Sequence, residues 1–174
     1  MALNDIRPLT ILTTGGTIEK IYDENEGVLQ NRDTIIRNKI LQKLRLPYTE
    51  IRVKSLMAKD SLYMDEADRA LITEAIKEHE KLGFPIVVLH GTDTMDVTAS
   101  YCLDHHATPA VPVVFTGAMK PMGFDDSDAT QNVVEAIFAA RLVAPGYWVT
   151  FHGQLYEVPR FRKNRQKGTF EAIS

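Results

Sequence analysis

Short apolar runs alternate along this chain with longer segments in which apolar residues recur every three or four positions. Residues 9–14 and 85–89 are dominated by aliphatic and β-branched residues. Such runs predict strands, and the apolar run 85–89 predicts a central parallel strand buried on both faces. Residues 51–56, 111–116 and 146–151 predict three further strands. A turn at Gly153 is expected to lead residues 154–158 back as a hairpin.

Helical spacing fills the intervals between these runs. Two aspartates are expected to cap helices at their N-termini. Asp65 precedes the pattern Ala67, Ala70, Leu71, Ala75 and Ile76, and Asp33 precedes the pattern Ile35, Ile36, Ile40, Leu41 and Leu44. Residues 97–106 and 129–143 predict two more helices. Residues 19–31 are polar and charged and include Gly27, which predicts a mobile surface loop.

Alternation of strands and helices predicts an α/β fold with a doubly wound, mainly parallel sheet. This is the three-layer α/β/α arrangement of Rossmann-like and flavodoxin-like domains. The length of 174 residues suits a single domain, residues 1–174. Right-handed crossovers bring the loops that follow the strands to the carboxyl edge of the sheet, where ligands bind in such folds.

Composition narrows the class of protein. The chain is 44% hydrophobic and 25% charged, with a net charge of -3, which is typical of a soluble globular protein and predicts no nucleic-acid partner. No apolar stretch reaches the length of a membrane span, and the N-terminus does not resemble a secretory signal. The single cysteine, Cys102, fits a reducing compartment, so a cytoplasmic location is expected.

Three glycine-containing segments follow predicted strands and are expected to meet at the carboxyl edge. Residues 13–18 read Thr-Thr-Gly-Gly-Thr-Ile, residues 90–95 read His-Gly-Thr-Asp-Thr-Met, and residues 116–121 read Thr-Gly-Ala-Met-Lys-Pro. Glycine lets the backbone approach a ligand and present N–H donors to an oxyanion. A threonine hydroxyl can attack a carbonyl when a base removes its proton. Together the three segments indicate a catalytic site.

Each segment also has a simpler interpretation when taken alone. The first can be a tight turn, the second a helix start capped by Thr92 or Asp93, and the third a packing loop. The first lacks the G-x-G-x-x-G spacing of a dinucleotide site. His105 and His106 point to different sides of a helix end and have no third ligand at suitable spacing, so no metal is expected. No cofactor is expected either.

Residues 14–18 and 90–95 resemble, in identity, spacing and order, the two signatures of the bacterial-type L-asparaginases. Residues 117–121 resemble a third segment of that family. The resemblance is to the amino-terminal domain and covers nearly the whole chain. It implies a hydrolase of linear amides that converts L-asparagine to L-aspartate and ammonia through an acyl-enzyme.

The resemblance also implies roles for catalytic residues. Thr17 matches the threonine nucleophile. Thr92 and Asp93 match the second threonine and its neighbouring aspartate, which work with a lysine, and Asp93 also holds the α-amino group of the substrate. Lys163 is the candidate lysine. A lysine partly desolvated between a carboxylate and a hydroxyl can release its proton and act as a base.

Substrate-binding residues follow from the same resemblance. The backbone N–H groups of Thr92 and Ala118 match the oxyanion donors, and Gly16 and Gly91 are expected to contact the substrate. Ser61 matches the serine that binds the α-carboxylate, although an exposed position ahead of a helix is an alternative interpretation of this residue.

The chain departs from the family pattern at two places, and its basic residues near Lys163 have two interpretations. The residue after Ser61 is usually polar but is Leu62 here. The family's lid tyrosine is absent after Gly27, and Tyr22 either replaces it in catalysis or packs on the surface. The basic residues within 160–167 form either a solvated tail or an anchor for Lys163.

The family usually continues into a second domain, which supplies an acidic group to a neighbour's site. We therefore expect a short form that assembles as a homo-oligomer, a dimer or tetramer, and completes its site without that domain. Two alternatives remain open. One is an amidase that acts on another small amide, feeding ammonia to a partner. The other is a non-catalytic module that senses asparagine or aspartate.

Overall fold

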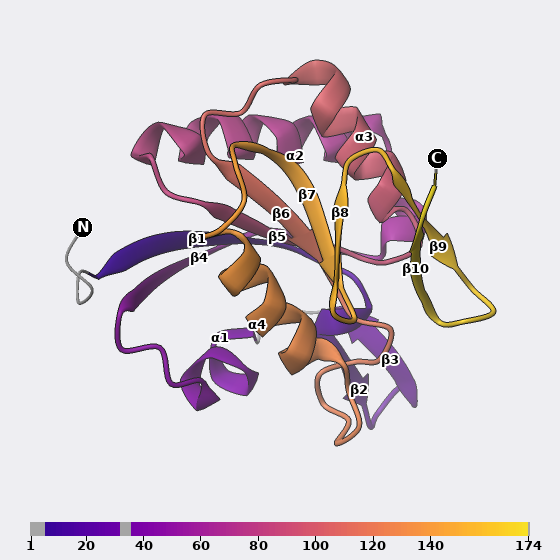
Figure 1. Ribbon diagram of the computed structural model, residues 1–174. Helices are drawn as coiled ribbons and strands as arrows, with labels where there is room; N and C mark the ends of the chain where they lie inside the picture. The colour runs from indigo at the N-terminus through magenta and orange to yellow at the C-terminus, as the bar shows by residue number, and fades with distance from the viewer. Residues whose placement is uncertain (1–5, 32–35, 174) are drawn as a thin grey trace.

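The computed structural model describes residues 6–31 and 36–173 and places a six-stranded sheet between two layers of helices (Figure 1). The strands of this sheet are β1 (Arg7–Gly15), β4 (Thr49–Lys59), β5 (Ile86–Leu89), β6 (Pro112–Thr116), β7 (Gly146–Phe151) and β8 (Gln154–Glu157). They lie in the order β4-β1-β5-β6-β7-β8, and β8 alone pairs antiparallel. The predicted doubly wound, mainly parallel α/β sheet is therefore confirmed.

The sheet is buried on both faces because its strands contribute apolar side chains to two separate cores. The main helices are α1 (Ile36–Lys39), α2 (Glu66–His79), α3 (Met95–His105) and α4 (Ala129–Ala139). Leu12 and Val88 pack in the core under α2 and α3, whereas Ile11 and Val87 pack in the core on the opposite face, with α1 and α4 (Figure 1). All four residues of β5 are fully buried, as the apolar run predicted.

Helix α2 begins where predicted but buries a different face. The Asp65 carboxylate accepts the N–H of Asp68, and the Asp68 carboxylate accepts the N–H of Asp65, so the two form a reciprocal cap. The buried apolar residues of the helix are Ile72, Ala75 and Ile76, while Leu71 is 48% exposed. The prediction that Ala67 and Leu71 lie inside was wrong, because the bulky isoleucines at i and i+4 set the contact with the sheet.

Two other helices differ from their expected bounds. Helix α4 ends at Ala139, and residues 140–143 continue as turns in which the N–H groups of Leu142 and Val143 bind the Ala139 carbonyl. Helix α1 is a single turn followed by the 3-10 helix η2 (Leu41–Lys43). The expected cap at Asp33 lies outside the described residues.

Residues 19–31 form a hairpin and not the loop that their polarity predicted. The short helix η1 (Thr17–Glu19) leads into β2 (Lys20–Asp23), which pairs antiparallel with β3 (Val28–Asn31). The turn closes through Gly27 at φ +68°, and the Asp23 carboxylate accepts the N–H groups of Asn25 and Glu26. Local hydrogen bonds thus stabilise this turn, and the segment lacks the run of apolar residues that marks a buried strand in a sequence.

A second hairpin lies outside the main sheet, beside β7 and β8 (Figure 1). Strand β9 (Phe161–Asn164) pairs antiparallel with β10 (Thr169–Ala172). Phe170 packs against Phe151 and Phe161 with ring centres 4.9 and 5.4 Å apart, and the Tyr156 hydroxyl donates to the Phe170 carbonyl at 2.9 Å. These contacts attach the hairpin to the sheet.

Two further 3-10 helices, η3 (Ser61–Tyr63) and η4 (Glu80–Leu82), complete the elements of the described residues. Helix η3 follows the carboxyl end of β4, so Ser61 lies at the same edge of the sheet as the three glycine-containing segments. No helix in the described part of the chain has the length and apolar character that crossing a membrane requires.

Candidate active site

The loops after β1, β5 and β6 meet so closely that their backbones touch. A methyl group at Gly16, which has φ +82°, would lie 2.5 Å from the Cα of Gly91. A methyl group at Gly91 would lie 2.5 Å from the Oγ of Ser61, and one at Gly117 would collide with the carbonyl of His90. The glycines therefore allow four segments to converge, as the sequence predicted for the carboxyl edge.

Thr17 follows this glycine contact directly and starts η1. The residues around it are fixed: Ile18 is fully buried and its carbonyl accepts the N–H of Met122, while Glu19 is buried and its carboxylate accepts the N–H of Gly15. Thr17 itself is only partly buried. Buried neighbours thus hold the backbone on both sides of a threonine that is itself only partly buried.

Lys163 is brought from β9 to the loop after β5. Its Nζ donates to the Thr92 Oγ1 at 2.7 Å and to the Asp93 Oδ1 at 2.9 Å. The side chains of Lys163 and Asp93 are only 16% and 21% exposed. The distances meet the expectation that the segment folds back over the carboxyl edge, and they exclude the interpretation in which Lys163 lies in a solvated tail.

The direction of the hydrogen bond between Lys163 and Thr92 determines which proton is free to move. An ammonium group only donates hydrogen bonds, so the Thr92 oxygen acts as its acceptor. The Thr92 hydroxyl proton is then left to point at another group. A hydroxyl that accepts a hydrogen bond from a lysine and donates one to a third group can pass a proton between the lysine and that group.

Arg165 is a second cation on the same carboxylate, and sequence reasoning assigned it no role. Its guanidinium lies 2.9 Å from the Asp93 Oδ1, the oxygen that Lys163 also binds. The Arg165 side chain is 70% exposed. Arg165 lies in the turn that follows β9, so no strand periodicity in the sequence marks it.

Ser61 is buried against the glycine contact. It is 1% exposed, its Oγ has no hydrogen-bond partner in the described part of the chain, and its carbonyl accepts the Thr94 hydroxyl at 2.9 Å. The alternative of an exposed position ahead of a helix is therefore wrong. Leu62 is 58% exposed, and its aliphatic side chain offers no hydrogen bond to a substrate.

Asp60 adds negative charge beside Ser61. Its carboxylate pairs with the Lys20 ammonium at 2.6 Å. Burial alone would raise the pKa of Asp60, but the hydrogen bonds from Lys20 and the Leu62 N–H outweigh it and lower the pKa, with a further contribution from the charge of Lys163. Asp60 therefore stays ionised and lies within the electrostatic reach of the Lys163 ammonium.

His90 supports the loop that carries Thr92. Burial lowers the pKa of His90 to about 4, so the ring is neutral at pH 7. Its Nδ1 lies 2.8 Å from the Gly91 carbonyl, which only accepts, so the proton is on Nδ1. The Nε2 atom has no hydrogen-bond partner among the described residues.

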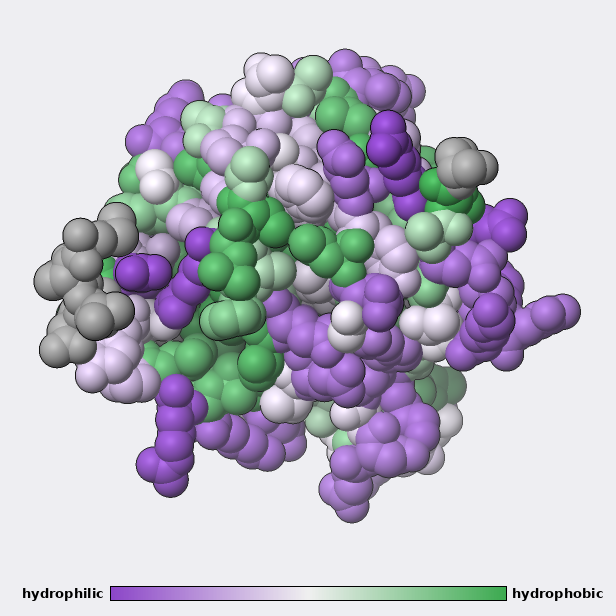
Figure 2. All heavy atoms as spheres, viewed as in Figure 1, coloured by the Kyte–Doolittle hydropathy of each residue, from purple (hydrophilic) through white to green (hydrophobic). Residues whose placement is uncertain are grey.

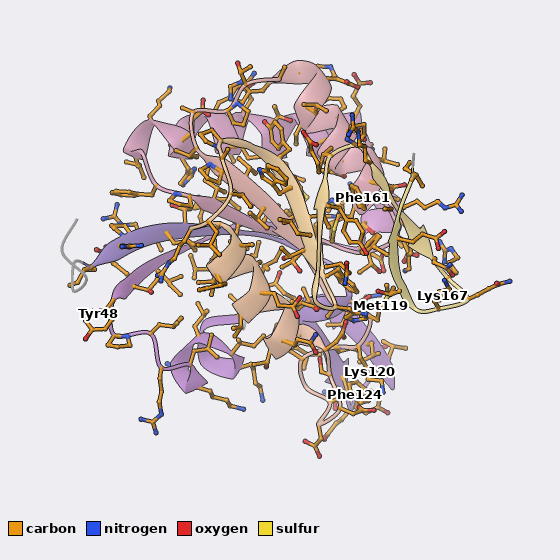
Figure 3. The ribbon with its side chains drawn as sticks, viewed as in Figure 1. Tyr48, Met119, Lys120, Phe124, Phe161 and Lys167 are labelled. Atoms are coloured by element: carbon orange, nitrogen blue, oxygen red, sulfur yellow. The ribbon has the colours of Figure 1, made fainter. Side chains whose placement is uncertain are left out.

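The loop after β6, which contains Ala118, is held by Asp128. The Asp128 carboxylate accepts the N–H groups of Met119 and Lys120, each at 3.0 Å. Asn132 donates to the Gly117 carbonyl at 2.9 Å and also to Asp128. Burial acts to raise the pKa of Asp128, but the hydrogen bonds from the Met119 N–H, the His152 ring and the Lys120 N–H outweigh it, and the pKa is lowered. Figure 3 labels Met119 and Lys120 in this loop.

Tyr22 lies at the surface. It is 58% exposed and lines a hollow of about 580 Å³ with Lys39 and Phe124, which Figure 3 labels. Its hydroxyl lies near the Gly27 turn. Among the described residues no hydrogen bond joins Tyr22 to the group formed by Thr92, Asp93 and Lys163. The structure thus does not bring Tyr22 together with the other candidate residues.

Metal-ligating side chains do not gather at this site. Within residues 6–31 and 36–173 no group of three histidine, cysteine, aspartate or glutamate residues is arranged to hold a metal ion. His106 instead lies 3.0 Å from the Glu80 carboxylate, and His105 bonds the Tyr101 carbonyl.

Comparison with known proteins finds one matching family domain and similar chains. The family domain described as "Asparaginase, N-terminal" matches residues 8–173. A glutamyl-tRNA(Gln) amidotransferase subunit of Methanococcus maripaludis is 31% identical over 97% of this chain and 43% of its own length. The L-asparaginase of Thermococcus kodakarensis is 30% identical over 95% of this chain and 51% of its own length. The chain thus spans about half the length of these relatives.

Solved structures show the same relationship. The thermostable L-asparaginase from Thermococcus kodakarensis superimposes with a TM-score of 0.84 at 30% identity, covering 95% of this chain and 51% of that one. L-asparaginase I from Vibrio cholerae superimposes with a TM-score of 0.80 at 25% identity, again over 95% and 51%.

Proposed function

Because this chain belongs to the asparaginase family, we propose that it hydrolyses the side-chain amide of L-asparagine to L-aspartate and ammonia. The observation that carries the proposal is the contact of Lys163 with Thr92 and Asp93, beside the loop of Gly16 and Thr17. A binding site has no need of two threonine hydroxyls and a partly buried lysine. The enzyme is therefore favoured over the sensor module.

The proposed reaction has two steps. The Thr17 oxygen bonds to the amide carbon and gives up its proton, the carbon–nitrogen bond breaks, and ammonia leaves with that proton while an ester remains on Thr17. Water then adds to the ester carbon, the bond to Thr17 breaks, and aspartate departs as the threonine regains a proton. In both steps the N–H groups of Thr92 and Ala118 stabilise the oxyanion.

Lys163 and Thr92 are proposed to move protons in these steps, with Asp93 holding the lysine in place beside Thr92. Asp93 also holds the α-amino group of the substrate, and Ser61 its α-carboxylate. Gly16 and Gly91 leave space for the substrate next to the backbone. Tyr22 is given no step, because its hydroxyl lies by the Gly27 turn.

A second candidate is release of ammonia for a partner protein. Several relatives that match nearly the whole chain are glutamyl-tRNA(Gln) amidotransferase subunits, including those of Methanococcus maripaludis. The chemistry at Thr17 would be the same, but a partner would consume the ammonia. Stimulation of ammonia release by a partner that binds the chain would favour this candidate.

The assay that tests the proposal is ammonia release by the purified protein from asparagine, glutamine and a panel of other small amides. We expect asparagine to be turned over fastest. Binding of asparagine in calorimetry without release of ammonia from any amide would contradict the proposed enzyme and support the sensor module.

The surface of α4 and β8 suggests self-association. Phe138 and Leu142 are 63% and 69% exposed, and Val134 and Leu155 are exposed beside them. Figure 2 shows apolar side chains gathered on this face. Exposed apolar groups of this kind mark contact surfaces, and we propose a homo-oligomer with two-fold symmetry. A monomer in light scattering at full activity would contradict a shared site.

The free thiol of Cys102 is relevant to the cellular compartment in which the protein works. Its thiol is buried and free, and burial raises its pKa to about 11, so it stays protonated and unreactive. A free cysteine fits a reducing compartment, and we propose that the protein works in the cytoplasm. Fractionation of cells that express the protein tests this location.

A further inference from the structure

His152 occupies a turn position that histidine seldom takes. Strand β7 ends at Phe151 and β8 begins at Gln154, so the turn consists of His152 at φ +48° and Gly153 at φ +78°. A two-residue hairpin turn with both φ values positive favours asparagine followed by glycine. A histidine in this left-handed conformation costs backbone free energy, which directs attention to its side chain.

The imidazole ring of His152 bridges two residues from distant parts of the chain. Its Nε2 lies 2.8 Å from the Asp128 Oδ2, and its Nδ1 lies 2.9 Å from the Thr169 Oγ1. A carboxylate only accepts hydrogen bonds, so the Nε2 carries a proton. In the neutral ring the Nδ1 then accepts from the Thr169 hydroxyl. Both ring nitrogens are therefore satisfied only while both partners stay in place.

On one side of this bridge is the loop that contains Ala118. Asp128 accepts the N–H groups of Met119 and Lys120, the two residues that follow Ala118. The backbone N–H of His152 also donates to the Asn132 Oδ1 at 3.2 Å. His152 thus binds the same polar group that positions the proposed oxyanion donor.

On the other side is the hairpin that carries Lys163. Thr169 begins β10 and pairs with Asn164, and the next pair in the register is Phe170 with Lys163. Strands β9 and β10 form a sheet of their own, so no main-chain ladder connects them to β7 or β8. Figure 3 labels Met119 in the Ala118 loop and Lys167 in the turn of this hairpin.

We propose that His152 is a positioning residue that holds the Ala118 loop and the Lys163 hairpin at a fixed separation across the active site. The catalytic part of this inference rests on the proposed function, because it takes Ala118 as an oxyanion donor and Lys163 as the base. The Ala118 N–H and Lys163 act on the same reacting amide. The distance between the loop and the hairpin that carry them therefore determines whether they can act together. A misplacement of about 1 Å can lower a rate by about a hundredfold.

The decisive variant is His152→Asn. Asparagine adopts the left-handed turn conformation more readily than histidine but is too short to reach both Asp128 and Thr169. We expect the thermal unfolding temperature to be maintained, while kcat falls by about ten- to a hundredfold and KM changes by less than about threefold. A residue with a purely structural role in the turn would show no loss of kcat in this variant.

Glu135→Ala is the matched control. The Glu135 Oε2 accepts the N–H of Gly153 at 2.9 Å and so anchors the same turn to α4, and its other hydrogen bond is to Gln131 of the same helix. We expect its kcat to equal that of the wild type, even if the unfolding temperature falls. Loss of kcat in this control equal to that in His152→Asn would overturn the proposal.

Thr169→Val tests the other end of the bridge. It removes only the hydroxyl that meets the His152 Nδ1 and keeps the shape of the side chain. We expect a loss of kcat similar to that of His152→Asn, and a double variant no slower than either single one, because all three break one connection. Fully additive losses would overturn the proposal.

Hydrogen–deuterium exchange tests the connection without using activity. In His152→Asn we expect faster exchange in residues 118–120 and 161–172 than in the wild type, and no such change in Glu135→Ala. Exchange unchanged in both segments would overturn the inference. If the wild type releases no ammonia while exchange changes as expected, the proposed function fails and the structural connection stands.

Discussion

The proposed nucleophile and the proposed base are held by different kinds of contact. Thr17 leaves β1, a strand paired on both sides, through glycines whose backbones touch the neighbouring loops. Lys163 lies on a hairpin that side-chain hydrogen bonds and packed aromatic rings attach to the sheet. Backbone contact leaves no space for an added atom, whereas side-chain contacts can be removed one at a time. Changes near Thr17 should thus be all-or-none, and changes around Lys163 should be graded.

Thr17→Ala should give the largest effect. Loss of a nucleophile usually costs several powers of ten in turnover, because no other group on the loop can form the acyl-enzyme. The fold should be retained, since Thr17 is partly exposed and its neighbours are buried independently. Ammonia release and thermal unfolding measure the two outcomes. Activity above about a tenth of the wild type would show that Thr17 is not the nucleophile.

Gly16→Ala tests the backbone contact, with Gly153→Ala as its matched control. Both glycines have positive φ, but Gly16, at φ +82° and ψ -176°, lies in a region that is essentially restricted to glycine, so its substitution also carries a backbone cost of its own. Only at Gly16 would the new methyl group meet another backbone, that of Gly91, whereas the space around Gly153 is open. We expect Gly16→Ala to lose activity by about a hundredfold or more and Gly153→Ala to keep it. Equal activities of the two variants would refute the idea that the contact between the Gly16 and Gly91 backbones positions the nucleophile.

Lys163→Met should lower turnover by about a hundred- to ten-thousandfold and change KM much less, because methionine keeps the stem of the side chain but cannot transfer a proton. Arg162→Met is the control on the adjacent residue, whose guanidinium pairs with Glu171 and is exposed. Steady-state kinetics on asparagine separate kcat from KM. Near-normal turnover of Lys163→Met would remove Lys163 from the mechanism.

Arg165→Gln should give the smallest effect. Its guanidinium is well exposed, and exposed ion pairs contribute little. Removing it frees the Asp93 oxygen for the ammonium group of asparagine, so KM should fall by less than about threefold at low salt. At about 1 M salt, where screening acts within about 3 Å, the difference should disappear. A KM that rises would show that Arg165 helps to bind the substrate.

Sequence patterns predicted the elements whose signals are local. The apolar run of β5, the Asp65 cap and the turn at Gly153 each depend on neighbouring residues, and each was found in place. The hairpin of β2 and β3 escaped prediction because each strand has only four residues, and its apolar pair, Tyr22 and Leu29, is exposed and not part of a core. Polarity alone could not separate a mobile loop from an exposed hairpin.

Candidate site residues were found where glycine marks a close approach or where the family resemblance names a residue, as for Lys163, and missed where a side-chain contact has neither signal. Gly16 and Gly91 identify their loops because few other residues fit there. The contacts of Arg165 with Asp93 and of His152 with Asp128 join residues far apart in the sequence, and no spacing rule encodes them. Such contacts depend on how the elements pack, which a single sequence does not display.

The parallel pairing of β1 has a consequence for how the chain acquires its structure. Thr10 pairs with Ile86, so β1 cannot complete its ladder until the chain as far as β5 has collapsed around it. Contacts of such long sequence separation slow folding, and they leave the apolar residues Leu9, Ile11 and Leu12 exposed in the meantime. The strand that leads to the proposed nucleophile is therefore exposed to aggregation during refolding, and the yield of refolded protein should fall as its concentration rises.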